Sequence, residues 1–262
     1  MPKFSSGAIW NRWGRSGCFR QPIVFVHVPK TAGQAVTRFL SQHCPSATSV
    51  APPFVGNYSM FTRPGRWSVI AGHFTYSRMR HLVPQGHFIT FLRDPVARAV
   101  SQFKSWKDPA KMTPEWRSVM SRDEQRLFAW IYEASFAEFV ANDHPAIVRA
   151  LSNSMATFLS SDGTADAHSA FDNLRTRFTA FGIQERFDDS IQILRSACPW
   201  LGPYRVPPVA ENRSRVVVDE ITPATRRRIE DLNDADLPLY REATALFQER
   251  VAAAVAPMCR AA

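Results

Sequence analysis

The sequence has few cysteines, and they lie far apart. Cys18, Cys44, Cys198 and Cys259 form no CxxC pair, which excludes the spacing of a zinc site and the dense framework of a small disulfide-bonded protein. Thiols at such distances predict free cysteines in a reducing compartment. Because histidine spacing offers no ligand set either, we expect no metal site.

Long apolar runs are also lacking. No stretch of about 18 apolar residues occurs, so we expect no helix that spans a membrane. The first 21 residues carry charge and no continuous apolar core, unlike a secretory signal peptide. We therefore expect a cytoplasmic protein in which residues 1–21 are an N-terminal extension and residues 22–262 form one domain.

Lysine is scarce, since only five of the 32 basic residues are lysine and 27 are arginine. No lysine-rich block is present, which argues against the basic tail of a nucleic-acid-binding protein. The net charge is nevertheless +9, so we expect an anionic ligand or surface partner. Lys30, which directly follows an apolar segment, is unusual in such a chain.

What the sequence does contain is an alternation of strand-like and helical segments. Hydrophobic residues make up 45% of the chain and charged residues 21%, as in globular proteins. Strands are predicted at 22–28, within 67–74 (ending near Ala71), within 87–95 and at 178–183, and helices at 33–42, 95–106 and 185–197. This alternation predicts an α/β fold with a central, mainly parallel sheet flanked by helices.

Turn and cap signals set several boundaries. Residues 45–66 are rich in proline and glycine and are predicted to be irregular. Asp94 is a favourable N-cap and Pro95 a favourable first residue for the helix at 95–106. Ser121 and Glu124 have capping-box spacing at the start of a helix over 121–142. A helical region over 223–255 is expected to be interrupted near Pro238.

The first candidate site is "PKTAG" at residues 29–33, between a buried strand and a helix. Ligands of parallel sheets bind beyond the carboxyl ends of strands, where the next helix presents unpaired N–H groups. Gly33 permits close approach of the backbone, Thr31 offers a hydroxyl donor, and Lys30 offers a positive charge. The pattern predicts an anion cradle, although an ordinary strand-to-helix turn with a solvated lysine is the alternative. It is not GxxxxGK[ST], because the glycine follows the lysine.

The second candidate site is "FLRDPVARAVSQF" at residues 91–103. Arg93 ends a strand and Ser101 follows about two helical turns later, so the two side chains could hold one phosphate. The alternative is structural, with Arg93 and Arg98 paired to Asp94 or to surface carboxylates.

Taken together, "HVPKTAG" and "FLRDPVARAVSQF" resemble the two signatures of sulfotransferases that use 3′-phosphoadenosine-5′-phosphosulfate (PAPS). The resemblance is to the carbohydrate-directed branch that includes heparan sulfate 2-O-sulfotransferases and bacterial relatives. Weaker landmarks follow in the family's order, at 153–160, 178–194, 211–215 and 232–247. The resemblance covers residues 22 to 248 and implies a P-loop-like, three-layer sulfotransferase domain over 22–262.

The resemblance also implies roles for particular residues. The 5′-phosphosulfate loop would consist of Lys30, Thr31, Ala32, Gly33, Gln34 and Ala35. Arg93 and Ser101 would bind the 3′-phosphate, and Asn212, Arg213 and Ser214 would close over the adenosine side. The family commonly has a small hydroxyl residue where this chain has Gln34 or Ala35, so one phosphate hydrogen bond is either missing or supplied by the Gln34 amide.

Sulfuryl transfer to a hydroxyl requires a base, and histidine suits this role near neutral pH. His73, in "VIAGHFTY", follows a glycine at a predicted strand end, and related carbohydrate enzymes have a histidine base in a similar Gly-His context. Lys30 would stabilise the leaving 3′,5′-ADP. His27 is a second candidate for the base, with burial against the core as its alternative.

Two other functions fit parts of the sequence. A nucleotide kinase would share the topology, but the chain lacks GxxxxGK[ST]. A non-catalytic module for anionic polymers would use the arginine excess and bind in a salt-dependent way. For the sulfotransferase, the family favours a sugar hydroxyl as acceptor, in a glycan or a glycosylated small molecule. Trp106 and Trp116 could stack on a sugar ring or belong to the core.

Overall fold

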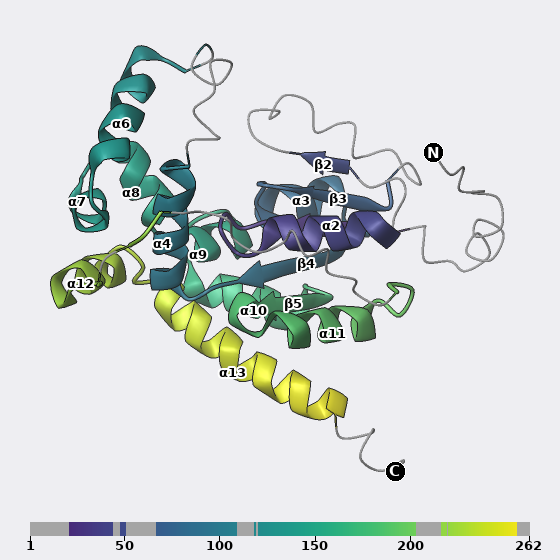
Figure 1. The fold of residues 1–262 in the computed structure, drawn as a ribbon. Coiled ribbons are helices and arrows are strands. Elements are labelled where there is room, and N and C mark those ends of the chain that lie inside the picture. Colours follow the sequence, from purple (N-terminus) through teal and green to yellow (C-terminus); the bar gives the residue numbers. More distant parts are fainter. Residues whose placement is uncertain are drawn as a thin grey trace, which may run out of the picture.

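The structure is a computed structural model, which describes residues 21–43, 48–50, 67–108, 118, 120–202, 216–218 and 220–255. Five strands form a sheet in the order β2-β3-β1-β4-β5. Their bounds are β1 (Ile23–Val26), β2 (Thr48–Val50), β3 (Val69–Gly72), β4 (His87–Leu92) and β5 (Ala180–Ile183). All four neighbouring pairs are parallel, so the carboxyl ends of the strands share one edge of the sheet (Figure 1). The predicted α/β fold class is confirmed.

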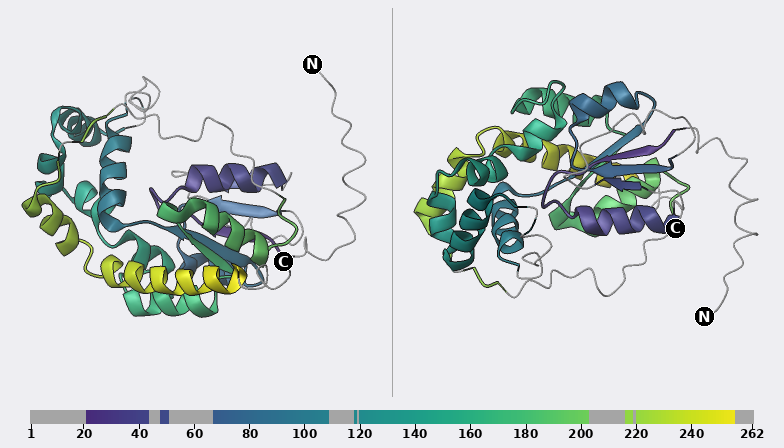
Figure 2. Two further views of the ribbon diagram at one scale, coloured as in Figure 1. Left: turned by 60° about the horizontal axis from the view of Figure 1, so that its bottom comes forward. Right: turned by 90° about the horizontal axis from the view of Figure 1, so that it is seen from above.

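Helices cover both faces of the sheet. Helices α2 (Gly33–His43) and α11 (Phe187–Ala197) lie on one face, and α3 (Tyr76–Leu82) and α10 (Ala167–Thr176) lie on the other (Figures 1 and 2). Helix α13 (Asp236–Val255) packs against α10, α11 and β5. This coverage explains why β1 is an uninterrupted apolar run, since every one of its residues is buried.

A group of helices lies beyond the carboxyl ends of the strands (Figure 1). Four of them, α6 (Arg122–Glu133), α7 (Phe136–Ala141), α8 (Pro145–Leu151) and α12 (Pro223–Asp231), pack around α4 (Pro95–Trp106) or each other. They enclose a second apolar cluster that includes Phe103 and Phe139. Trp106 packs on this cluster with its ring 5.5 Å from Phe128, so it serves the core. Trp116 lies outside the described residues.

The predicted cap of α4 is present. Asp94 Oδ1 accepts a hydrogen bond from Ala97 N at 2.8 Å, and Pro95 is the first helical residue. Its missing N–H costs nothing there, because the first four N–H groups of a helix have no partner within the helix.

Three predicted segments differ from the structure. Residues 48–50, predicted to be irregular, form edge strand β2, because Thr48 and Val50 suit a strand despite the surrounding prolines. Residues 121–142 form two helices, because a second capping box at Ser135 and Glu138 begins α7. The break in 223–255 lies at 232–235, and Pro238 occupies the first turn of α13, where proline is tolerated.

A polar cluster joins α4, α9 (Ser154–Leu159) and α13. We call its members the polar lock: Arg98, Asn233 and Asp236, which are buried, and Asn153, which is half-buried. Asp236 accepts hydrogen bonds from Met155 N (3.0 Å) and Ala156 N (2.7 Å) at the start of α9. In return, Asn153 Oδ1 accepts hydrogen bonds from the Ala235 and Asp236 N–H groups at the start of α13. Two of the weaker landmarks, 153–160 and 232–247, therefore hold each other in place.

Arg98 completes the polar lock from α4. Its side chain is fully buried and donates to Ala150 O (3.0 Å) and Leu151 O (2.5 Å). Burial raises the pKa of Asp236, and the positive charge of Arg98 opposes that shift. For Arg98, the structural alternative of pairing with Asp94 or a surface carboxylate is wrong, because the side chain is buried and donates to backbone carbonyls. For Arg93 it holds in part, since this side chain forms an ion pair with Glu185.

Candidate active site

The β1–α2 loop, residues 27–32, has an unusual backbone. Lys30 (φ 72°) and Ala32 (φ 64°) both adopt the left-handed conformation, which costs non-glycine residues energy and is concentrated at functional sites. Thr31, between them, is buried, and its hydroxyl donates to Val28 O at 2.8 Å. The hydroxyl that the sequence offered to a ligand is therefore used to hold the loop in shape.

The start of α2 has open hydrogen-bond donors. Ala32 O accepts from Ala35 N (3.0 Å) and Val36 N (3.1 Å), so Ala35 N is engaged within the helix turn. Among the described residues, no acceptor faces the N–H groups of Gly33 and Gln34. Two open donors at the positive end of a helix dipole, next to Lys30, favour an anion. The Gln34 side chain is exposed beside them.

The His27 side chain leaves room only for glycine at position 33. A Cβ built on Gly33 would lie 1.6 Å from His27 Nε2, so the imidazole of His27 occupies the space that any side chain would need. No other residue fits at this position without displacing the His27 ring.

His73 lies directly after β3 and faces the loop. Its Nδ1 is 2.8 Å from His27 O, and the two imidazole centroids are 4.2 Å apart. Because a carbonyl only accepts, Nδ1 carries the proton and Nε2 keeps its lone pair. Burial lowers the pKa of His73 from 6.5, the hydrogen bond to His27 partly offsets this, and the charge of Lys30 lowers it further. The His73 imidazole is thus neutral near pH 7, with the lone pair of Nε2 free to accept a proton.

Arg93 connects the two predicted motifs. Its Nη1 donates to Lys30 O at 3.2 Å, across the neighbouring carboxyl ends of β1 and β4. Its Nε is buried without a hydrogen-bond partner, and lies 3.9 Å from Glu185 Oε1. Burial lowers the pKa of Arg93, and the charge of Glu185 opposes this shift. A half-buried, incompletely satisfied guanidinium is suited to an added phosphate oxygen.

Glu185 holds Arg93 in place, a role that the sequence did not indicate. Its carboxylate accepts hydrogen bonds from Asp94 N (3.1 Å) and Tyr240 OH (3.0 Å). Both Glu185 and Tyr240 belong to segments that resemble family landmarks, and that resemblance is the signal that could have pointed to them. Desolvation, followed by the charge of Glu185, raises the pKa of Tyr240, so the phenol stays protonated and donates.

The structure brings eight of the predicted residues to one edge of the sheet: Lys30, Thr31, Ala32, Gly33, Gln34, Ala35, His73 and Arg93. Ser101 lies further along α4, half-buried, and within the described ranges no hydrogen bond joins it to the others. Asn212, Arg213 and Ser214 lie outside the described residues. We call Lys30, Gly33, His73 and Arg93, together with His27, the donor edge.

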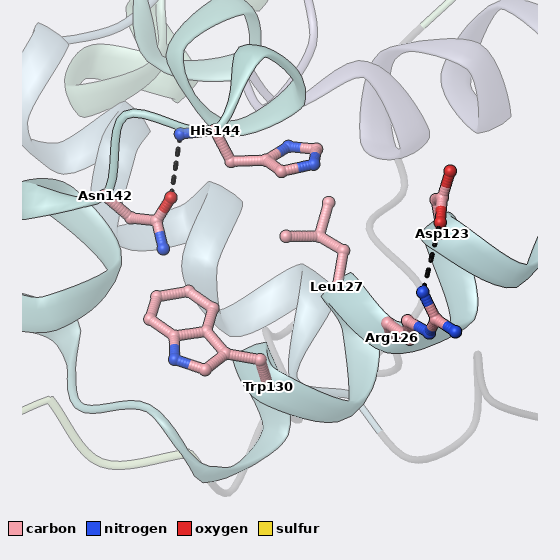
Figure 3. A pocket seen from close by; sticks show the side chains of 6 residues that line it. All are labelled: Asp123, Arg126, Leu127, Trp130, Asn142 and His144. Atoms are coloured by element: carbon pink, nitrogen blue, oxygen red, sulfur yellow. Dashed lines mark hydrogen bonds and ion pairs between the residues drawn. The ribbon is translucent and has the colours of Figure 1, made fainter.

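A pocket with a volume of about 350 Å³ lies elsewhere, on α6 and the α7–α8 turn (Figure 3). Trp130, Leu127 and His144 face its interior, and an Asp123–Arg126 ion pair borders it. None of the predicted site residues lines this pocket.

Comparison with known proteins matches the family model described as galactose-3-O-sulfotransferase over residues 11–261. The chain belongs to the galactose-3-O-sulfotransferase family. This membership confirms the predicted sulfotransferase family and its carbohydrate-directed branch. No curated protein matches the chain.

Solved structures similar to this family member include two sulfotransferases. One is mouse sulfotransferase SULT7A1 complexed with PAP, with 16% identity, a TM-score of 0.41, and coverage of 81% of this chain and 63% of the mouse chain. The other is a sulfotransferase from Alicyclobacillus acidocaldarius, with 20% identity, a TM-score of 0.39, and coverage of 87% and 96%. The chain therefore spans less than two thirds of the mouse protein. Within the described residues, no helix is both long and apolar enough to cross a bilayer.

Proposed function

We propose that this family member transfers the sulfuryl group of PAPS to a hydroxyl of a galactose-containing acceptor. One observation carries the proposal: the β1–α2 loop and the β4–α4 turn meet through the Arg93–Lys30 hydrogen bond, with the neutral base His73 beside them. The family description names galactose and its 3-hydroxyl, and this supports the choice of acceptor.

The residues at the donor edge fit a doubly phosphorylated nucleotide. The open N–H groups of Gly33 and Gln34 and the charge of Lys30 would hold the 5′-phosphosulfate, and Arg93 would hold the 3′-phosphate. PAPS supplies the sulfuryl group, and its bond to the 5′-phosphate oxygen breaks as the acceptor oxygen bonds to sulfur, releasing 3′,5′-ADP (PAP).

The chain's own residues then have two tasks. His73 accepts the acceptor hydroxyl proton at Nε2, the nitrogen that the hydrogen bond to His27 leaves unprotonated. Lys30 neutralises the negative charge that develops on the departing phosphate, an interaction that is stronger in the transition state than in the ground state. Arg93 fixes the nucleotide without touching the bond that breaks.

The experiment combines binding with turnover. We expect PAP to raise the melting temperature and ATP to leave it unchanged, because a ligand that binds the native state stabilises it. Incubation with radiolabelled PAPS should label terminal galactosides and not the matched glucosides. Stabilisation by ATP would favour a kinase, and salt-sensitive polymer binding without a PAP response would favour a non-catalytic module.

Two variants test the assigned roles. Lys30→Ala and His73→Ala should each lower kcat about 10²–10³-fold, the usual effect of removing such a group, with melting temperatures near that of the wild type. Arg126→Ala, on the exposed face of α6, is the matched control and should keep full turnover. Full activity in both active-site variants would refute the mechanism.

A further inference from the structure

His27 contacts both halves of the donor edge. Its imidazole fills the space over Gly33 at the start of α2, and lies against the His73 ring with a centroid distance of 4.2 Å and an interplanar angle of 32°. Its backbone is bonded only to the His73 half, since His27 N donates to Gly72 O (3.0 Å) and His27 O accepts from His73 Nδ1 (2.8 Å). One residue therefore sets the distance between the phosphate cradle and the base.

The ring of His27 acts by packing. It stacks on Phe25 from the core side, with a centroid distance of 5.3 Å and an interplanar angle of 15°. Within the part of the chain that the structure describes, neither ring nitrogen of His27 makes a hydrogen bond. Burial and the charges of His73 and Lys30, the titratable groups that face it, lower the pKa of His27 to about 3, so the ring adds no charge.

From these contacts we infer that His27 is a positioning residue, which orients the base His73 and shapes the Gly33 turn through one neutral, stacked ring. The inference rests on the proposed function, because it assigns His73 the role of base. It adds a specific dependence: the environment of His73 and the affinity of the cradle for the donor are both set by the His27 ring.

The direct test compares His27→Ala with His27→Phe. Removing the ring admits water to His73, so the His73 pKa should rise toward 6.5, which NMR titration of its Cε1–H resonance measures without any turnover. The acid limb of kcat/KM should shift upward in the same variant, and kcat should fall about 10–100-fold through misplacement of the base. His27→Phe keeps a stacked ring and should retain most of the wild-type His73 pKa and PAP affinity.

A second pair of variants tests the contact with Gly33. Gly33→Ala places a Cβ into the His27 ring and should weaken PAP binding about tenfold or more. The double variant Gly33→Ala/His27→Ala removes the obstacle and should bind PAP better than Gly33→Ala alone. An effect of His27 on stability alone would leave the His73 pKa unchanged and give no rescue, and that result would overturn the inference.

The two proposals fail in different ways. Absence of a PAP response and of sulfation in the wild type would refute the proposed function. A wild type that sulfates galactosides, with a His73 pKa that does not move in His27→Ala, would refute only the role of His27.

Discussion

The donor edge and the polar lock are both polar clusters built from motif residues, yet their hydrogen bonds differ. In the polar lock, both carboxylate oxygens of Asp236 and the amide of Asn153 are bonded to helix ends or neighbouring side chains. At the donor edge, the Gly33 N–H and the Arg93 Nε have no acceptor within the described chain. Arg98 Nε of the polar lock also has no hydrogen-bond partner, but its side chain is fully buried, whereas the side chain of Arg93 is 20% exposed at the edge of the sheet. Unpaired donors that lie next to the surface are available to a ligand.

The comparison also separates two arginines that are five residues apart, Arg98 fully buried and Arg93 half-buried. Arg98 donates two hydrogen bonds to the α8 carbonyls and serves the core, whereas Arg93 donates to Lys30 O and faces the carboxyl edge of the sheet. The motif alone did not distinguish these roles, because the partners of Arg98 are at residues 150, 151 and 236.

The largest expected effect comes from breaking the polar lock. Asp236→Asn leaves the Arg98 charge without compensation and weakens the cap of α9, so the free energy of unfolding should fall by about 3 kcal/mol or more. Urea denaturation measures the loss, and PAP affinity of the folded fraction should not change. Asp234→Asn, at an exposed neighbour, is the control and should lose far less.

A substitution at the donor edge should instead weaken PAP binding and leave the stability of the fold nearly unchanged. Arg93→Ala should weaken PAP binding about 10–100-fold through loss of a charge-assisted hydrogen bond, with a small change in unfolding free energy. Isothermal titration calorimetry with PAP and with 5′-AMP measures the effect, which should be larger for PAP. Equal losses for both nucleotides would contradict the assignment of Arg93 to the 3′-phosphate.

Thr31 tests the difference between the two clusters. It lies in the β1–α2 loop beside the donor edge, yet its hydroxyl is bonded within the fold, as the groups of the polar lock are. Thr31→Val leaves Val28 O without its donor and should lower the free energy of unfolding by about 1–2 kcal/mol. Thr31→Ser keeps the hydroxyl and should lose less. A Thr31→Val protein with wild-type stability and no PAP binding would show instead that the hydroxyl serves the ligand.

The smallest effect is expected far from both clusters. Ser135→Ala removes the N-cap of α7, whose hydroxyl accepts from Glu138 N, and should lower the free energy of unfolding by about 1 kcal/mol. Ser135→Thr retains a capping hydroxyl and serves as the control. Neither change should alter the PAP affinity, which calorimetry can check.

Local signals in the sequence predicted much of the fold. The Asp94-Pro95 pair fixed the start of α4, and the apolar runs located β1, β3, β4 and β5 to within a few residues. The sequence contains the capping box at Ser135 as well, but apolar spacing continues across it and predicts one helix over 121–142 in place of two. The edge strand β2 was not predicted, because its three residues are too few to show a periodic pattern and they lie among prolines and glycines.

The site was predictable where its residues lie in a strand-to-helix turn, and not where distant contacts define them. Lys30, Gly33, His73 and Arg93 all follow strands that the sequence located. Two contacts could not be predicted in this way: the contact of the His27 ring with Gly33 and the support of Arg93 by Glu185. Both depend on how elements that are separate in the sequence pack together, which no single segment encodes.

The pairing of β4 with β5 has a consequence for biosynthesis. Residues 93–179 separate these two neighbours, so a nascent chain completes β4 long before its partner β5 is made. During that interval the apolar edge of β4 lacks its final hydrogen-bond partner, and exposed strand edges of this kind promote aggregation. Translation speed and chaperone access over the intervening helices should therefore govern how much of this enzyme reaches its native state.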